Sequence, residues 1–214
     1  MRKNVFVVNN LIAHRGVHYK YLENTIPSFL EAIKKQYIIE LDIQLTKDEE
    51  IIVFHDTNLK RIFGIDRDIS DLTLKEIKKY KYIPTLKESL NIINGRVPII
   101  IDIKSNKKDC RKICKILDCY DGKFAIQSFN PLVILWFKRY KPKYIRGYLI
   151  YKFLYLKYIL YILNPDYIAT NLTNLKKLNK YRKKYILIGY TIKNKKEYHV
   201  YKTYADNFIC DIQR

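Results

Sequence analysis

Two carboxylates lie two residues apart inside an apolar, β-branched run. The run at residues 38–45 reads IIELDIQL and contains Glu40 and Asp42. Successive side chains of a strand alternate between its faces, so both carboxylates project from one face and can share a cation or a proton. A charged pair in so apolar a segment costs several kcal/mol unless something compensates it. The compensating group is typically a metal, and oxygen ligands on one face suit a hard divalent cation.

Polar side chains that can do chemistry also follow other apolar runs. One of these runs begins at Ile51 and ends in a histidine and an aspartate. A histidine titrates near neutral pH and can act as an acid or as a base. The polar residues placed in this way are His14 and Arg15, Glu40 and Asp42, His55 and Asp56, Asp102 and Lys104, and Gln127 and Ser128.

The elements that must position these residues are short strands alternating with helices. Helix starts are indicated at Thr25, which precedes Pro27, and at Thr85, which follows Pro84. The strand candidates lie within residues 5–13, 38–45, 99–103, 124–127, 144–149, 167–169, 186–190 and 208–210, and a further helix is expected at 172–184. Strands and helices in alternation predict an α/β protein, a compact (β/α)8 TIM barrel, formed by residues 1–214 as a single domain.

A further apolar run, Ile51 to Phe54, does not fit the alternation. Only the polar residues 46–50 separate it from the preceding strand, and a parallel connection needs a dozen or more residues. The two runs must therefore form a hairpin. We expect an insertion at about residues 46–82, after the second strand, that contains this hairpin and a helix with Asp71 or Thr73 as its N-cap.

The polar residues then share one place in the fold. They lie at the C-terminal ends of successive strands, and in a parallel barrel those ends form one rim. Active sites of such barrels are built on that rim. The sequence therefore predicts a site with two or three carboxylates, a lysine, an arginine and His14, to which the hairpin delivers His55.

The net charge of +20 by itself favours a nucleic acid or an anionic membrane surface as the partner. The lysines, however, are scattered, without a basic stripe interleaved with aromatic residues, and no nucleic-acid motif is present. Abundant Lys, Ile, Asn and Tyr are typical of an AT-rich genome. We expect no dedicated nucleic-acid binding, and a general attraction for phosphate-bearing substrates or membranes remains.

The cysteines match neither a C-x-x-C redox pair nor a zinc site. They are Cys110, Cys114, Cys119 and Cys210, and we interpret them as reduced thiols of a cytoplasmic protein. The apolar run at residues 5–8 is too short for a secretory signal.

Residues 148–163, YLIYKFLYLKYILYIL, form the most apolar stretch. Lys152 and Lys157 interrupt it, and it is shorter than the roughly 20 residues that span a bilayer. Two interpretations remain open. The stretch is an ordinary barrel helix that buries its apolar side, or it makes a peripheral contact with a membrane surface beside the site.

The order of these motifs resembles the glycerophosphodiester phosphodiesterases, in the superfamily of the phosphatidylinositol-specific phospholipases C. The resemblance runs nearly end to end and depends on the joint order and spacing of many short motifs. The motifs are Ala13-His14-Arg15-Gly16, Glu23-Asn24-Thr25, Glu40-Leu41-Asp42, Thr46-Lys47-Asp48, His55-Asp56, Ile83-Pro84-Thr85-Leu86, Gln127-Ser128-Phe129, Tyr190-Thr191-Ile192 and residues 205–211.

The resemblance implies a metal site. In the family the Glu-x-Asp pair, here Glu40 and Asp42, binds one divalent cation such as Mg²⁺, Ca²⁺ or Mn²⁺. The family's third ligand is a glutamate, and here the position is Asp102. An aspartate is one methylene shorter, so the cation must shift, a water must bridge, or Asp102 does not ligate directly.

The resemblance also implies the remaining roles. His14 and His55 correspond to the general base and the general acid, Arg15 clamps a phosphate oxygen, Asn24 donates to the phosphate, and Lys104 adds positive charge. The nucleophile is either a glycerol hydroxyl, which gives a cyclic phosphate, or water. Neither the leaving alcohol nor the oligomeric state follows from the sequence.

Three functions are considered. The first is hydrolysis of a small glycerophosphodiester to glycerol phosphate and an alcohol. The second is a phospholipase-type or glycerol-phosphate-polymer hydrolase on the same fold, and the third is a catalytically silent relative that binds phosphate ligands. We interpret His18 and His199 as surface or loop residues and Asp206 and Asp211 as structural, while Asp56 either orients His55 or caps a turn.

Overall fold

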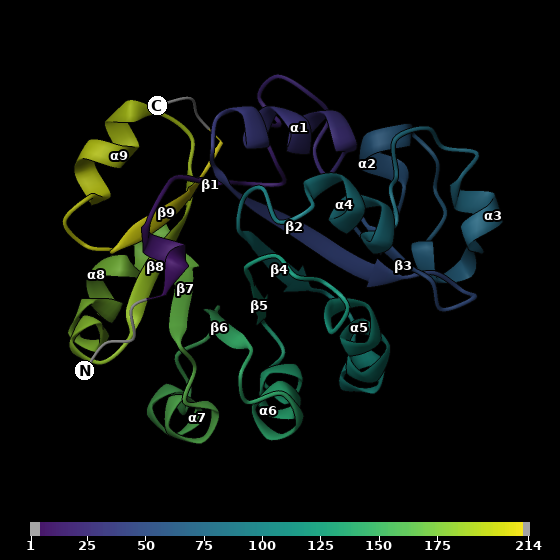
Figure 1. Ribbon diagram of the computed structural model, residues 1–214. Helices are drawn as coiled ribbons and strands as arrows, with labels where there is room; N and C mark the ends of the chain where they lie inside the picture. Colours follow the sequence, from purple (N-terminus) through teal and green to yellow (C-terminus); the bar gives the residue numbers. More distant parts are fainter. Residues whose placement is uncertain (1–4, 212–214) are drawn as a thin grey trace.

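The structure is a computed structural model that describes residues 5–211, and it contains a closed barrel of eight parallel strands. The first strand, β1, pairs with β2 on one side and with β9 on the other, which closes the barrel (Figure 1). The barrel strands are β1 (Ile12–Ala13), β2 (Ile38–Leu45), β4 (Ile99–Ile103), β5 (Phe124–Ser128), β6 (Ile145–Ile150), β7 (Tyr167–Asn171), β8 (Ile186–Ile192) and β9 (Asn207–Cys210). The predicted fold class is confirmed.

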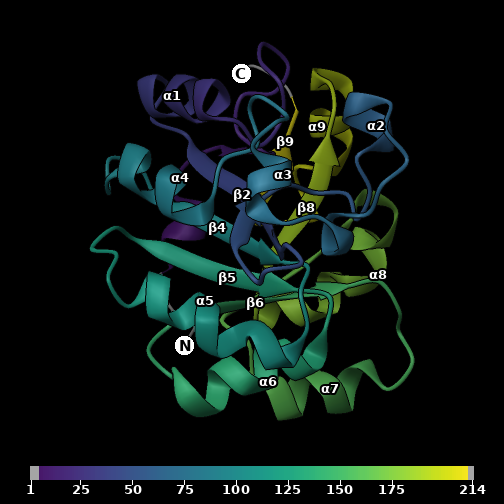
Figure 2. The same ribbon diagram turned by 90° about the vertical axis from the view of Figure 1, so that its right-hand side faces the viewer.

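Helices between the strands cover the outside of the barrel, as the two views together show (Figure 2). Thr85 and Glu88 form a reciprocal N-terminal cap, in which each side chain accepts from the other residue's backbone N–H. The helices are α1 (Ile26–Lys34), α2 (Lys60–Phe63), α3 (Leu74–Ile77), α4 (Leu86–Ile93), α5 (Cys110–Leu117), α6 (Pro131–Tyr140), α7 (Leu156–Leu163), α8 (Leu175–Leu178) and α9 (Lys195–Tyr201). Thr25 and Thr73 precede α1 and α3 as N-caps, in agreement with the predicted helix starts.

Along each barrel strand, every second side chain points into the interior, and these inward-pointing side chains fill the barrel from the N-terminal ends of the strands to the rim. Ile38 and Ile100 lie in the apolar cluster of the interior, together with Tyr167 and Ile188. Two residues further along the same strands, the same face carries carboxylates instead of isoleucines. The interior is therefore apolar at its lower end and charged at the rim.

Two predicted segments differ from the structure. In residues 5–13 only Ile12–Ala13 is a strand, because Phe6–Val8 forms the 3-10 helix η1 and packs into the apolar interior cluster. Residues 172–184 are not one helix but η4 (Leu172–Asn174), α8 and η5 (Asn179–Lys183). Apolar residues recur there every third position, at 172, 175, 178 and 181, which fits the three residues per turn of a 3-10 helix.

The strand β3 (Ile51–Val53) runs antiparallel to β2 and lies outside the barrel. The chain that follows it, with η2 (Ile69–Asp71), α2 and α3, packs around a small apolar cluster of its own that includes Phe54 and Leu59. The Phe54 backbone N–H donates to the Asp42 carbonyl at 3.0 Å. This bond fixes His55 beside the rim end of β2.

All four cysteines are free thiols, and Cys110 and Cys114 are both buried on α5. The remaining short element is η3 (Lys107–Asp109), which precedes that helix. Among the described residues, no helix has both the length and the apolar character of a membrane span.

Candidate active site

Three buried carboxylates meet at the rim of the barrel. Glu40 and Asp42 come from β2 and Asp102 from β4, where Asp42 and Asp102 are direct partners in the parallel register. One oxygen of each residue lies within 4.8 Å of the others. Burial, together with the charges of Asp42 and Asp102, raises the pKa of Glu40 well above its ordinary value, and burial raises the pKa of Asp102 to about 6. Like charges this close need a positive partner.

Two cationic side chains supply part of that charge. Lys104 Nζ lies 2.6 Å from Asp102 Oδ2 and 3.1 Å from Asp42 Oδ1. Arg15 Nε lies 3.3 Å from Asp42 Oδ2, and the Arg15 backbone N–H donates to Glu40 Oε2. Burial alone would raise the pKa of Asp42, but Lys104 and Arg15 outweigh it, and the pKa is lowered.

The donor set fits a divalent cation. Asp102 Oδ1 is buried and has no hydrogen-bond partner within residues 5–211, although Asp102 Oδ2 is paired with Lys104. An unpartnered carboxylate oxygen beside two further carboxylates is a suitable position for a hard cation. The shorter side chain of Asp102 therefore still lies in the same cluster as Glu40 and Asp42.

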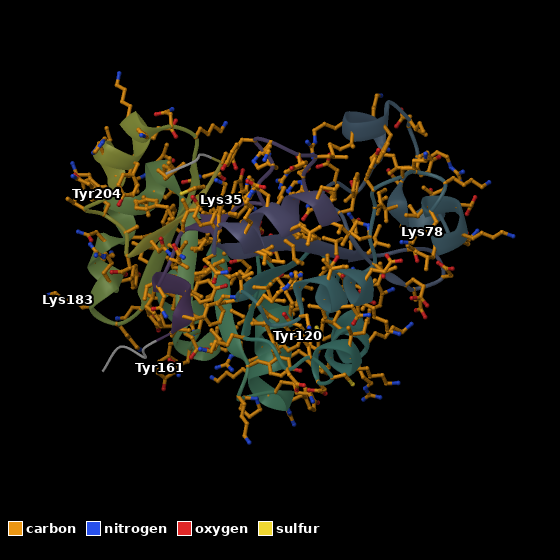
Figure 3. The ribbon with its side chains drawn as sticks, turned by 45° about the horizontal axis from the view of Figure 1, so that its top comes forward. Lys35, Lys78, Tyr120, Tyr161, Lys183 and Tyr204 are labelled. Carbon is orange, nitrogen blue, oxygen red and sulfur yellow. The ribbon has the colours of Figure 1, made fainter. Side chains whose placement is uncertain are left out.

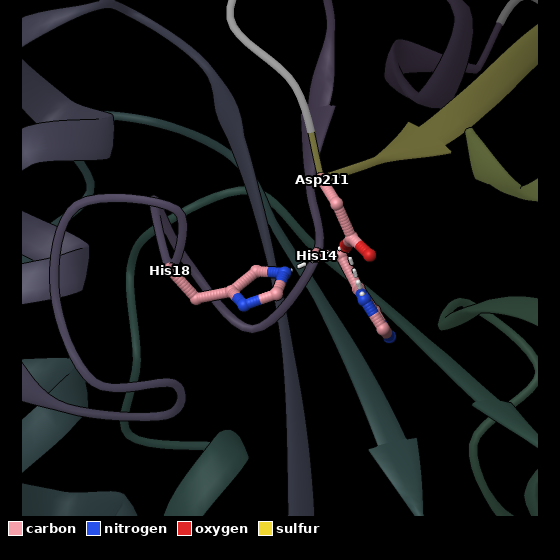
Figure 4. Close-up of side chains that lie close together, drawn as sticks. All are labelled: His14, His18 and Asp211. Atoms are coloured by element: carbon pink, nitrogen blue, oxygen red, sulfur yellow. Dashed lines mark hydrogen bonds and ion pairs between the residues drawn. The ribbon is translucent and has the colours of Figure 1, made fainter. Parts of the chain in front are cut away.

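His14 is held by a carboxylate from the other end of the chain. Its Nδ1 lies 2.7 Å from Asp211 Oδ1, and His18 Nε2 lies 2.7 Å from the same oxygen (Figure 4). Because Ala13 and Cys210 are partners in the β1–β9 register, the residues that follow them come side by side. Burial opposes ionisation of Asp211, but the hydrogen bonds to both histidines dominate and lower its pKa far below the ordinary value.

His55, which follows the hairpin strand β3, is also held at Nδ1 by a carboxylate. Its Nδ1 lies 2.6 Å from Asp56 Oδ1, and Asp56 Oδ2 accepts from Arg61 Nε at 2.5 Å. Arg61 in turn binds both oxygens of Glu23. Burial lowers the pKa of His55 against the opposing effect of Asp42 and Asp56. In both histidines Nδ1 is engaged by a carboxylate, so Nε2 is the nitrogen left to act on a ligand.

The turn after β1 needs unusual backbone geometry. Arg15 and Asn24 both have positive φ angles, of 53° and 56°, and the Asn24 N–H donates to the Arg15 carbonyl at 2.9 Å. Gly16 has φ +78°, and a Cβ atom there would lie 2.4 Å from Ser28 Oγ, so only glycine fits. This turn directs the Arg15 guanidinium toward Glu23, whose Oε1 accepts from Nη1 at 2.7 Å.

Asn24 lies behind the carboxylates rather than in the open site. Its side chain is 2% exposed, donates through Nδ2 to Asp42 Oδ2 at 2.9 Å and accepts the Asp42 backbone N–H through Oδ1. Ser128 is similarly engaged, because its hydroxyl donates to the Ile103 carbonyl at 2.7 Å.

A cavity of about 180 Å³ opens over the carboxylates. Of the predicted residues, those that line it are His14, Arg15, Glu40, Asp42, His55, Asp102, Lys104 and Gln127. The lining also includes the apolar or aromatic side chains Phe129, Leu149, Tyr190 and Ile209. Phe129 lies next to the charged residues, with its ring centre 5.8 Å from Lys104 Nζ.

Two residues beside the site were not predicted from the sequence. Asp211, interpreted as structural, binds His14, and His18, interpreted as a surface or loop residue, shares that carboxylate. The position of Asp211 directly after the last strand was a usable signal, because the same rule located the other rim residues. No comparable signal was present for His18, which lies in a loop. His199 is exposed on α9, and Asp206 pairs with Arg182.

Comparison with known proteins gives a consistent result. The profile of the glycerophosphoryl diester phosphodiesterase family matches residues 14–158. A lysophospholipase D of Homo sapiens is 34% identical over 140 residues, which are 56% of this chain and 44% of that protein. A glycerophosphodiester phosphodiesterase of Caldanaerobacter subterraneus is 38% identical over 109 residues, 44% of this chain and 45% of that protein. The chain thus spans less than half the length of these relatives.

Solved structures agree with the barrel. A glycerophosphodiester phosphodiesterase from Thermotoga maritima has a TM-score of 0.82 at 26% identity, and the match covers 99% of this chain and 96% of that one. A phosphodiesterase from Oleispira antarctica, in complex with the product sn-glycerol-3-phosphate, has a TM-score of 0.84 at 22% identity, with 94% and 92% covered. The second likeness concerns the fold alone.

Proposed function

The chain belongs to the glycerophosphoryl diester phosphodiesterase family, and from this premise we propose that it is a metal-dependent phosphodiesterase. It cleaves a glycerophosphodiester to glycerol phosphate and an alcohol. The observation that carries the proposal is the buried trio of carboxylates with two histidines at the same cavity, each held at Nδ1 by its own carboxylate. We further propose that residues 1–214 act as one domain, with residues 46–82 as an insertion.

Glu40, Asp42 and Asp102 would hold the cation. When bound, a divalent ion such as Mg²⁺, Ca²⁺ or Mn²⁺ supplies Lewis acidity and orients the phosphate. The burial of Asn24 against Asp42 supports a role in positioning that carboxylate instead of the predicted contact with phosphate.

His14 and His55 act as the general base and the general acid. One histidine takes the proton of the attacking hydroxyl through Nε2, and the hydroxyl oxygen bonds to phosphorus. The bond from phosphorus to the leaving alcohol oxygen breaks, and the other histidine protonates that oxygen. Asp211 and Asp56 hold the two rings in place through Nδ1. The attacking hydroxyl comes from the glycerol, giving a cyclic phosphate that water then opens, or from water directly.

Arg15 and Lys104 stabilise the phosphate. Both side chains line the cavity, and both already face the carboxylates, so they are oriented before substrate arrives. The guanidinium can donate to two phosphate oxygens, whereas Lys104 acts as a point charge. Their charge opposes the negative charge that develops during the displacement.

A lysophospholipase D is the second candidate. Apolar and aromatic side chains in the cavity lining, among them the exposed Phe129, favour it, because a lysophospholipid brings an acyl chain to the same phosphodiester. The relative from Homo sapiens carries that name. A silent, ligand-binding relative is disfavoured, because the charged residues of the site are all present at the cavity.

A substrate panel tests these alternatives. Glycerophosphocholine, glycerophosphoethanolamine, glycerophosphoglycerol, a glycerol-phosphate polymer and lysophosphatidylcholine are each incubated with Mg²⁺, Ca²⁺ or Mn²⁺. The primary proposal predicts release of glycerol phosphate from at least one of the first three. Release of choline from lysophosphatidylcholine alone would support the second candidate. Absence of cleavage of every substrate would refute the proposal that the chain is an enzyme.

A further inference from the structure

The most exposed apolar side chains of the described chain gather between β6 and the end of α7. Tyr151, Leu154 and Tyr155 in the loop are 69%, 71% and 68% exposed, and Tyr158 and Tyr161 on α7 are 67% and 78% exposed. The other side of the same helix packs on the barrel through leucines 156, 160 and 163, which are all buried. Packing of the barrel is therefore complete without the exposed residues, and they remain available to a partner.

Lysines surround this apolar surface. A hollow of about 470 Å³ lies between the start of α7 and the α8–η5 segment. Its lining consists mainly of aromatic residues and lysines. Lys177 Nζ lies 5.8 Å from the Phe153 ring centre, and Lys180 Nζ lies 5.4 Å from the Tyr181 ring centre. We define the aromatic–lysine face as Tyr151, Lys152, Phe153, Leu154, Tyr155, Lys157, Tyr158, Tyr161, Lys177 and Lys180. Figure 3 shows Tyr161, and Lys183 from the neighbouring η5, at the outer edge of the molecule.

The charge of this face is uncompensated. Residues 151–165 and 172–184 contain no aspartate or glutamate. Within residues 5–211, none of the four lysines of the face forms an ion pair with a carboxylate. A second exposed apolar surface, around Tyr82 and Ile92, differs in this respect, because there Glu88 pairs with Lys78 at 2.5 Å. Of these two surfaces in residues 5–211, the aromatic–lysine face is the one that combines exposed rings with a single sign of charge.

The face adjoins the candidate active site. Its loop begins directly after β6, at the carboxyl end of a barrel strand, and β6 also contributes Leu149 to the wall of the active-site cavity. A surface that contacts this loop is thus brought to the rim that carries the carboxylates.

We propose that the aromatic–lysine face docks the protein on an anionic lipid bilayer. Tyrosine is suited to the headgroup region, where its ring is in apolar surroundings and its hydroxyl remains hydrated. Lysines near such a surface are attracted to lipid phosphates. The interaction does not depend on the reaction proposed above, and it places the rim of the site beside phosphodiesters of the bilayer surface.

Co-sedimentation of the full chain with vesicles tests the proposal. Vesicles of phosphatidylcholine mixed with phosphatidylglycerol are expected to bind the chain, and pure phosphatidylcholine vesicles to bind it much less. The variant K152Q/K157Q/K177Q/K180Q is expected to lower the partition coefficient at least about tenfold. The matched control K75Q/K79Q/K81Q/K87Q removes the same charge from exposed positions on α3, on α4 and between them, and it is expected to change the partition coefficient by less than about threefold.

A second pair of variants tests the apolar part. Y151S/L154S/Y158S is expected to weaken binding at least about tenfold through lost apolar contact, and the control L30S/Y82S/I92S to leave it nearly unchanged. Absence of wild-type binding to anionic vesicles would overturn the proposal. Equal losses in the two lysine variants would overturn it as well, because net charge alone would then explain binding.

Turnover of a water-soluble glycerophosphodiester is measured in parallel. None of the substituted residues lines the active-site cavity, so turnover is expected to stay the same in all four variants. Failure of the proposed reaction appears as an inactive wild type, whereas failure of the docking surface appears only in the vesicle assay.

Discussion

Asp42 and Asp102 are opposite each other on the neighbouring parallel strands β2 and β4, with both carboxylates buried inside the barrel. Cross-strand like charges destabilise a sheet, and burial adds to the effect. Lys104 bridges the two through one oxygen of each, and Asp102 Oδ1 is left unpartnered within the described chain. A cation bound to the carboxylates, as proposed above, would explain this arrangement.

Stability of the metal-free protein should depend on pH through Asp102. Burial raises its pKa to about 6 in the folded protein, from an ordinary value of 3.8. Between these values the folded state holds a proton that the unfolded state has lost, so the free energy of unfolding falls as pH rises through this window. Glu40 acts in the same direction. Thermal unfolding of the wild type and of Asp102→Asn in EDTA across pH 4 to 7 checks the sign. The wild type should lose stability relative to the variant as pH rises, and a gain relative to the variant would contradict the prediction.

Removal of either histidine should lower turnover by orders of magnitude. His14→Ala and His55→Ala each remove a group that transfers a proton, and such groups contribute about 10²- to 10⁴-fold to the rate. The control is His199→Ala, at an exposed position on α9, which should retain wild-type turnover. Circular dichroism confirms that each variant is folded. Retained activity in either of the first two variants would remove that histidine from the mechanism.

Asp211→Asn should lower kcat by about 10²-fold or more, with little change in KM. The substitution keeps the size of the side chain but removes the charge that holds His14 at Nδ1. The matched control is Asp121→Asn, at an exposed position in the connection between α5 and β5, and this variant should have wild-type kinetics. An equal loss in both variants would mean that the effect of Asp211 is not specific to His14.

Asn24→Ala should weaken metal binding before it affects substrate binding. Asn24 donates to Asp42 Oδ2 from a buried position, and loss of such a supporting residue typically costs about 10- to 100-fold in metal affinity. The measurement is the metal concentration that gives half-maximal activity. A raised KM for substrate with unchanged metal dependence would instead assign Asn24 to the phosphate, as the resemblance implied.

The sequence predicted the barrel and most of the cavity because both follow from local patterns. Alternation along β2 places Glu40 and Asp42 on one face, and the end of each strand marks the rim. The pairing of His14 with Asp211 depends instead on closure of the barrel between β1 and β9, which joins residues 197 positions apart. Tyr158 is exposed and Leu156 is buried because only one side of α7 meets the barrel. The sequence of this stretch is apolar on both sides of the helix, so it does not indicate which side is buried.

The central claim is that the carboxylate trio holds a cation required for phosphodiester cleavage. Its most direct test is calorimetric titration of the EDTA-treated chain with Mn²⁺, with hydrolysis of a glycerophosphodiester measured on the same samples. We predict one ion bound per chain, activity that rises in proportion to occupancy, and loss of both in Glu40→Gln. Full activity of the metal-free chain, or binding that survives in Glu40→Gln, would contradict the claim.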